Sequence, residues 1–228
     1  MSLVLYGHPL ASFCQKVLIA LYENATPFEN RLVDLSDEVS RANLFRFWPI
    51  GKMPLLRDEA RDSTIPETTI IIEYLDHYYS GPTRLLPLEI DRALQVRLWD
   101  RFFDHYVQVP MQTIVSHRRR PEGTADEIEV AACRATLTTA YAMIEKQLGE
   151  SSWVTGEAFT MADCAAAPAL FYAETLVPFC EEQPKLRAYY NRLLARSSFA
   201  RALEEARPYF RFYPYQEKLP ARFRDAAE

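Results

Sequence analysis

The sequence has little of what several classes of protein require. It holds only four cysteines in 228 residues, and they lie too far apart to form C-x-x-C pairs or a disulfide framework. No apolar run reaches the roughly 18 residues that cross a bilayer, and no basic segment of a secretory signal precedes the first apolar residues. We therefore expect a cytoplasmic protein with reduced thiols, no metal site and no membrane contact.

Basic residues are also outnumbered by acidic ones. The chain carries 26 lysines and arginines against 31 aspartates and glutamates, a net charge of −5 at pH 7. Without an overall positive field to attract a phosphate backbone, nucleic acid is not an expected partner. Hydrophobic residues make up 49% of the chain, which is typical of a globular protein with a sizeable core.

The first third of the chain reads as alternating strands and helices. Apolar runs predict strands at 2–6, 28–33 and 55–57, and the turn-rich residues 58–62 indicate a hairpin. Helices are predicted from Ser12, which stands in the place of an N-cap, from 37 to 47, and from Glu67 after Pro66. Because a βαβ opening favours a parallel strand pair, we predict a βαβαββα domain over residues 1–80.

The pattern changes after Gly81 and Pro82, where strand-like runs disappear. We predict a linker at 81–88 and an all-α domain over 89–228. Helical spacing of apolar residues continues from Leu94 to Pro110, which should kink or divide the segment. Capping-box patterns at 124–127 and 160–163 predict the starts of two further helices, and two more helices fit residues 184–196 and 198–205.

Four motifs follow one another in this frame: Leu5-Tyr6-Gly7-His8-Pro9 before Lys16-Val17, Gly51-Lys52-Met53-Pro54-Leu55, Pro66-Glu67-Thr68, and Phe159-Thr160-Met161-Ala162-Asp163. With a proline directly before the third strand and an all-α domain after the hairpin and helix, they resemble the soluble glutathione S-transferase family, in its bacterial theta-like, serine-type form. The resemblance covers nearly the whole chain. It implies a thioredoxin-like N-terminal domain followed by a helical domain, with glutathione as co-substrate and no metal.

The resemblance also implies a glutathione site. Met53 before Pro54 would pair its backbone with the cysteinyl residue of glutathione, with a cis bond exposing that edge. Glu67 would attract the α-ammonium of the tripeptide, while the N–H groups at Thr68 would hold its α-carboxylate. Lys52 would neutralise the glycine carboxylate, with a solvated surface lysine as the alternative. The alternative for Glu67 and Thr68 is a plain helix cap.

The group that activates the thiol is less evident. The family's usual serine or cysteine falls five residues before Lys16, and here that position is Ala11. Ser12, one place later, is therefore the catalytic candidate through its hydroxyl or its backbone N–H, with a simple N-cap as the alternative. Tyr6 and Cys14 are backups, although an aromatic closing a strand and a cysteine among apolar neighbours are more typical of a core.

By the same analogy the electrophile site lies between the domains. The first long helix of the all-α domain and the turn after the first strand would line it, and the candidates are His8, Phe103, Tyr106, Val107 and Met111. Aromatic residues of the tail would form a lid, with packing across the domain seam as the alternative: Tyr209, Phe210, Phe212 and Tyr213. Thr160 and Asp163 are assigned to folding.

The expected activity is transfer of glutathione, as thiolate, to a small hydrophobic electrophile. The family also implies a homodimer in which the helix around Leu94–Asp104 packs on the partner's N-terminal domain. Three alternatives stay open: a glutathione-dependent isomerase or dehalogenase, a reductase that uses Cys14, and a non-catalytic binding or assembly module, which Ala11 favours.

Overall fold

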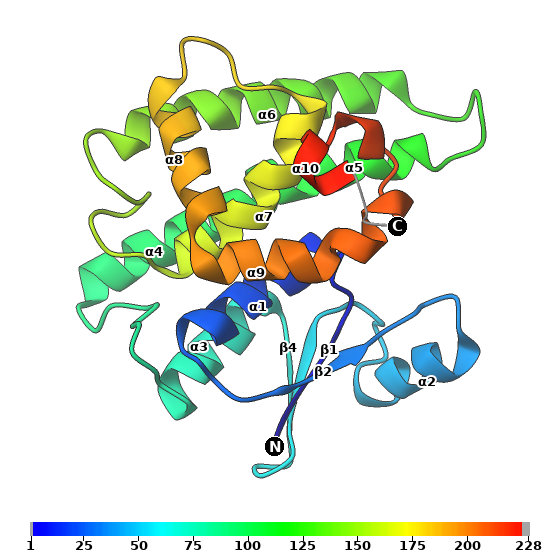
Figure 1. Ribbon diagram of the computed structural model, residues 1–228, viewed down its shortest axis with the longest axis vertical. Helices are drawn as coiled ribbons and strands as arrows, with labels where there is room; N and C mark the ends of the chain where they lie inside the picture. The colour runs from blue at the N-terminus through cyan, green and yellow to red at the C-terminus, as the bar shows by residue number, and fades with distance from the viewer. Residues whose placement is uncertain (1, 225–228) are drawn as a thin grey trace.

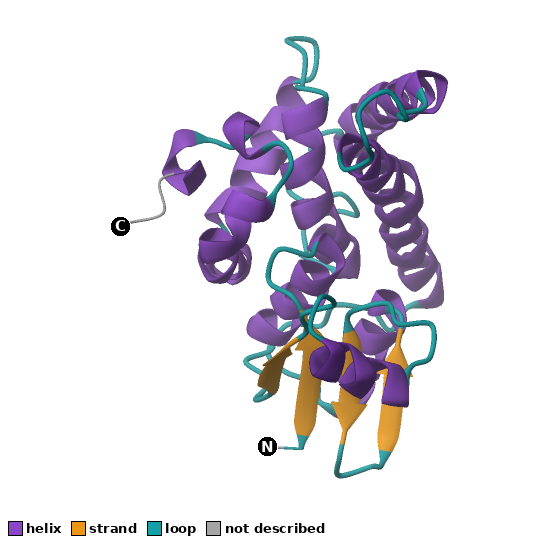
Figure 2. Ribbon diagram, turned by 90° about the vertical axis from the view of Figure 1, so that its right-hand side faces the viewer, coloured by secondary structure: helices purple, strands orange, loops and turns teal. Residues whose placement is uncertain are grey.

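The computed structural model describes residues 2–224. A small sheet with its helices lies below a larger group of helices in Figures 1 and 2. The lower part contains β1 (Leu3–Gly7), α1 (Ser12–Glu23), β2 (Glu29–Leu32), α2 (Glu38–Phe47), β3 (Leu55–Asp58), β4 (Ser63–Pro66) and α3 (Thr68–Tyr78). The predicted βαβαββα order is confirmed.

The sheet has the strand order β2-β1-β3-β4. β1 is parallel to β2 and antiparallel to β3, and β3 forms the predicted hairpin with β4. Successive side chains of a strand point to opposite faces, so Leu3 and Leu5 pack in the main core with α1 and α3. Val4 and Tyr6 pack in a second cluster that includes Leu44 of α2.

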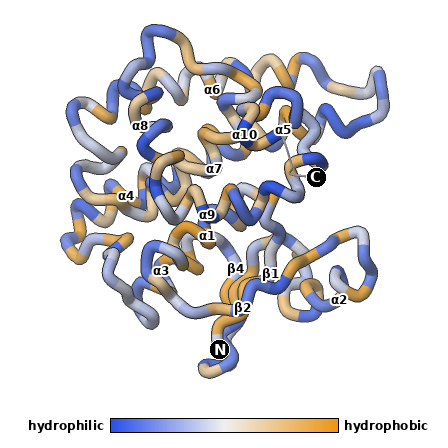
Figure 3. Tube along the Cα trace, in the orientation of Figure 1, coloured by the Kyte–Doolittle hydropathy of each residue, from blue (hydrophilic) through white to orange (hydrophobic). Residues whose placement is uncertain are grey.

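The second part of the described chain is helical. It contains α4 (Ile90–Phe102), a π-helical turn (Phe103–Gln108), α5 (Val109–Arg118), α6 (Glu127–Leu148), α7 (Met161–Leu176), α8 (Pro184–Ala195), α9 (Ser197–Ala206), two 3₁₀ segments (Arg207–Phe212 and Gln216–Lys218) and α10 (Ala221–Arg224). Almost every residue of α7 is buried, and Figure 3 shows this central helix as largely hydrophobic. Within residues 2–224, none of the helices combines the length and apolar character needed to cross a membrane.

Two predicted helix starts need correction. Ala11, not Ser12, is the N-cap of α1, so no side-chain oxygen caps the first turn of that helix. Asp126, not Thr124, caps α6, because its carboxylate accepts from the N–H groups of Ile128 and Glu129. The capping box of Thr160 and Asp163 is present at the start of α7.

Pro110 does not divide the helical segment. The chain continues from α4 into α5 through the π-helical turn, and Pro110 lies in the first turn of α5. Proline has no N–H to give to the carbonyl of residue 106, and wide helical turns are a known way to accommodate such a break in the ladder. This turn changes which side chains face α1.

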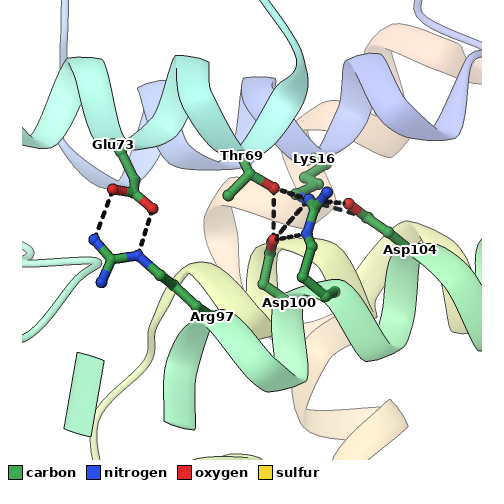
Figure 4. A network of polar contacts seen from close by, with 7 residues as sticks. Lys16, Thr69, Glu73, Arg97, Asp100 and Asp104 are labelled. Carbon is green, nitrogen blue, oxygen red and sulfur yellow. Dashed lines mark hydrogen bonds and ion pairs between the residues drawn. The ribbon is translucent and has the colours of Figure 1, made fainter. Parts of the chain in front are cut away.

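A buried polar network joins the two parts of the molecule. The Lys16 ammonium lies 2.7 Å from an Asp100 oxygen and 2.8 Å from an Asp104 oxygen, and it donates to Thr69 Oγ1 at 3.3 Å. Figure 4 shows Lys16 surrounded by these three side chains, with the Glu73–Arg97 pair to one side. The network fixes α1 and α3 against the end of α4.

Candidate functional site

Two cavities lie where the sheet part meets the helical part. The larger has a volume of about 910 Å³ and is lined by the 8–13 segment, residues 32–36, Met53, α5 and the C-terminal tail. The smaller, about 240 Å³, is lined by Phe13, Trp48, Lys52, Met53, Pro54, Glu67, Thr68, Arg101, Asp104, His105, Val109 and Gln112. Phe13, Met53 and Gln112 line both cavities, so the two adjoin.

All five residues predicted to bind glutathione line the smaller cavity. The Met53–Pro54 peptide bond is cis, as the resemblance implies. Thr68 begins α3, and its N-cap Glu67 has φ 67° and ψ 120°, a left-handed conformation that a residue with a Cβ rarely adopts. Such outliers gather at ligand sites, and this one turns the chain sharply where α3 begins.

The smaller cavity also contains charged and polar residues that the sequence did not indicate. Arg101, Asp104 and His105 come from the end of α4 and the π-helical turn. With Lys52 and Glu67 they give the cavity groups of both signs, which suits a ligand that carries both an ammonium and carboxylates. These residues lie far along the chain from the N-terminal motifs, and nothing in their own sequence indicated a site.

Ser12 lines the larger cavity, next to the residue Phe13 that both cavities share. It is the first residue of α1. Its side chain is 5% exposed, and its hydroxyl oxygen accepts a hydrogen bond from the Gln108 amide. Because Ala11 has no capping oxygen, the first N–H groups of α1 have no side-chain cap.

Tyr6, the first backup, is part of the core. Its side chain packs in the cluster with Val4 and Val33, and its hydroxyl accepts from Arg31 Nη1 at 2.7 Å. It is absent from the lining of both cavities within the described chain. Tyr6 is therefore a core residue rather than a lining residue of the candidate site.

Cys14, the second backup, is equally unsuited to nucleophilic chemistry. The residue is 1% exposed, and its sulfur accepts from the His8 N–H at 3.4 Å. Burial raises the pKa of this thiol to about 12, so it stays protonated at neutral pH. Since the thiolate is the nucleophile, Cys14 behaves as a packed core thiol.

Only some of the residues predicted for the electrophile site line a cavity. His8 and Met111 line the larger cavity, but Phe103 and Val107 are completely buried in the core, and the prediction that they face the site is wrong. Tyr106 is 54% exposed and lines neither cavity of the described chain. The π-helical turn is the physical reason, because an extra residue per turn rotates side chains away from the face that α-helical spacing predicts.

The C-terminal tail covers one side of the larger cavity. Tyr209, Phe212 and Tyr213 line it, whereas Phe210 is 2% exposed and packs in the core. Tyr172 of α7, which the sequence placed only in a core helix, also lines the cavity and donates to the Leu10 carbonyl at 2.9 Å. The residues described contain no group of three or more histidines, cysteines or acids that could hold a metal ion.

His8 is expected to make the protein less stable in acid. Its Nδ1 accepts from the Leu10 N–H at 3.1 Å, which requires a neutral ring, and burial lowers its pKa from 6.5. The His8 ring therefore binds a proton more tightly in the unfolded chain than in the folded one. The stability that the neutral ring contributes is fully present above pH 6.5, and it is lost as the pH falls through the lower pKa of the folded state. Asp34 opposes but does not cancel the effect of burial.

Urea unfolding of the wild-type chain and of His8→Asn, between about pH 7.5 and 5, checks this. Asparagine offers an oxygen to the same N–H group but does not titrate, so the variant should lose less stability in acid. Equal losses in both proteins would show that His8 is not the group responsible.

Two family models match the chain. The model described as "Glutathione S-transferase, N-terminal domain" matches residues 5–83, and "Glutathione S-transferase, C-terminal domain" matches residues 102–197. Among curated proteins, a glutathione S-transferase of Hypomyces subiculosus is 25% identical and covers 91% of this chain and 100% of its own. A probable maleylacetoacetate isomerase of Vibrio cholerae is 28% identical over 91% of this chain and 98% of its own.

Solved structures are similar over most of the chain. A glutathione S-transferase of Methylobacillus flagellatus with glutathione bound is 25% identical, has a TM-score of 0.81, and covers 88% of this chain and 98% of its own. One from Methylobacterium radiotolerans, in complex with glutathione sulfonate, is 27% identical with a TM-score of 0.76 and covers 88% and 93%.

Proposed function

The chain belongs to the glutathione S-transferase family, and from that membership we propose how its two cavities carry out glutathione transfer. Glutathione binds in the smaller cavity, with the γ-glutamyl group at Glu67 and Thr68 and the glycine carboxylate at Lys52. The cysteinyl residue pairs with the backbone of Met53, which lines both cavities. The sulfur then lies at the first turn of α1, facing the larger cavity.

The observation that carries this proposal is the junction of the cavities. The thiol of a tripeptide bound beside Met53 can reach Ser12 and at the same time face the larger cavity. The lining of that cavity includes apolar side chains such as Leu10, Met111 and Val115. The Ser12 hydroxyl and the N–H groups without a side-chain cap at the start of α1 favour the thiolate over the thiol. The thiolate attacks a carbon of the electrophile, and the leaving group departs with the bonding electron pair.

The direct test mixes the protein with glutathione and chlorodinitrobenzene and follows formation of the thioether. We expect product with glutathione and none with S-methylglutathione, which fills the same site without a free thiol. An isomerase would instead return glutathione unchanged after each turnover, so its consumption separates the two activities. A protein that gives no product and shows no heat of glutathione binding in calorimetry would contradict the proposal.

The reductase alternative predicts a different result for Cys14. We expect Cys14→Ala to keep kcat/KM for conjugation within about twofold, because a buried protonated thiol takes no part in the reaction. Steady-state assays of the variant beside the wild-type protein measure this. A large loss of glutathione-dependent disulfide reduction in Cys14→Ala would instead support a reductase that uses Cys14.

We also propose a homodimer that works in the cytoplasm. Ile90, Leu94 and Leu98 repeat every four residues along α4 and are 73%, 54% and 57% exposed, and such a stripe of large apolar side chains on one helix face favours a contact surface. The four cysteines are free, which fits a reducing compartment.

Leu98→Arg should turn the dimer into a monomer, because it places a charge in the middle of the α4 stripe. Sedimentation velocity measures the change in mass. Ile128→Arg is the matched control, since Ile128 is 85% exposed but lies on α6, away from the stripe. If both variants keep the wild-type mass, the α4 stripe is not the dimer surface.

A further inference from the structure

A buried glutamine reaches the proposed catalytic serine from the other half of the molecule. Gln108 is the last residue of the π-helical turn between α4 and α5. It is 2% exposed, and its Nε2 donates to Ser12 Oγ across 96 residues of sequence. This is a contact between the helical part and the first turn of α1.

The wide turn explains why this side chain faces α1. Val107 and Gln108 are both buried, while Tyr106 and Val109 on either side are 54% and 46% exposed. One additional residue in a helical turn rotates the following positions by about 100°. The helix therefore turns a polar side chain inward directly before α5 begins, and Ser12 is its partner.

The direction of the hydrogen bond leaves one proton available. A serine hydroxyl has one hydrogen and two acceptor lone pairs. Gln108 donates to one of the lone pairs of the Ser12 oxygen. Among residues 2–224, no acceptor for the Ser12 hydroxyl hydrogen is found. That hydrogen is therefore free to point into the larger cavity, which Ser12 lines.

We infer that Gln108 is a positioning residue: by donating to Ser12 Oγ, it aims the Ser12 hydroxyl hydrogen at the sulfur of bound glutathione. The inference rests on the proposed function, in which Ser12 stabilises the thiolate. Gln108 itself does not touch the sulfur. The thiol proton leaves to solvent, and the Ser12 hydrogen stays on its oxygen while it bonds to the sulfur anion.

Gln108→Glu reverses the hydrogen bond with almost no change of shape. An ionised carboxylate only accepts, so it takes the Ser12 hydrogen and leaves the sulfur without that donor. We expect the thiol pKa of bound glutathione, measured by thiolate absorbance, to rise by about one unit, and kcat/KM near pH 7 to fall about tenfold. Glutathione affinity, measured by calorimetry on the thiol form, should change much less.

Gln108→Leu tests the loss of the hydrogen-bond donor without adding a negative charge. It also replaces Gln108→Glu if a buried carboxylate prevents that variant from folding. Leucine keeps the volume but removes the donor, so the hydroxyl loses its orienting partner and the thiol pKa should rise by a smaller amount. A rise in Gln108→Leu cannot come from repulsion by a new negative charge. If the thiol pKa is unchanged in this folded variant, the inference is wrong.

A double-mutant cycle with Ser12→Ala distinguishes positioning from a structural role. If Gln108 acts through Ser12, then Gln108→Leu, which brings no charge, should add almost nothing in the Ser12→Ala background, whereas independent effects would add. Additive losses would overturn the inference. A thiol pKa that does not respond to Ser12→Ala at all would instead contradict Ser12 as the activator in the proposed function. A response to Ser12→Ala without a response to Gln108→Glu would overturn the role of Gln108 alone.

Discussion

Ser12→Ala is expected to lower kcat/KM for conjugation roughly 100-fold near neutral pH, the usual cost of removing one donor from a developing or stabilised anion. The backbone N–H groups at the start of α1 remain in the variant, so some activity should persist. The rise of kcat/KM with pH should also move to higher pH, because the bound thiol ionises less readily. A steady-state pH profile of both proteins measures the two effects together.

Ser12→Thr is the matched control, because threonine keeps a hydroxyl at the same position in the first turn. It should retain most of the activity and a pH profile near that of the wild type. If Ser12→Ala has an unchanged profile, activation belongs to the backbone N–H groups alone, and the hydroxyl of Ser12 has no part in it.

Lys16→Met is expected to lower the free energy of unfolding by about 3 kcal/mol, because it removes the buried one of the two cations that pair with these carboxylates and leaves only the partly exposed Arg101. Lys16 is 1% exposed, and Asp100 and Asp104, which it contacts at 2.7 and 2.8 Å, have side chains 0% and 7% exposed. Urea unfolding monitored by circular dichroism gives the difference. Methionine has a side chain of similar length to that of lysine, so lost packing contributes little.

Arg97→Met is the control for Lys16→Met, because its ion pair with Glu73 joins α4 to α3 beside the Lys16 network (Figure 4). Its side chain is 42% exposed, and such a pair contributes less than about 1 kcal/mol in water. Equal losses in the two variants would show that burial does not govern the strength of the Lys16 network.

Local signals account for the parts of the fold that were predicted correctly. The hairpin, the start of α3 after Pro66 and the capping box of Thr160 and Asp163 each depend on residues that are neighbours in the chain. The N-cap positions Ala11 and Asp126 were missed because Ser12 and Thr124 have side chains that commonly cap helices, whereas Ala11 has no capping oxygen at all. Competition between adjacent caps is decided by packing, which the sequence alone does not show.

In the candidate site too, residues in short motifs were predicted, and residues that only the fold brings together were missed. The residues of the smaller cavity from Lys52 to Thr68 lie in short motifs around a proline and a helix start, and they were predicted together. Asp104 and Gln108 were missed because they meet α1 across 88 and 96 residues of sequence. Phe103 and Val107 were misplaced because α-helical spacing does not anticipate a π-helical turn.

The most direct test of the account is the ultraviolet absorbance of glutathione bound to the wild-type protein, titrated from about pH 5 to 9. We expect the bound thiol to ionise at a pH well below the range in which free glutathione ionises, and the absorbance to disappear when S-methylglutathione is bound instead. Glutathione that binds with the thiol pKa of the free tripeptide would contradict a thiolate held at the first turn of α1.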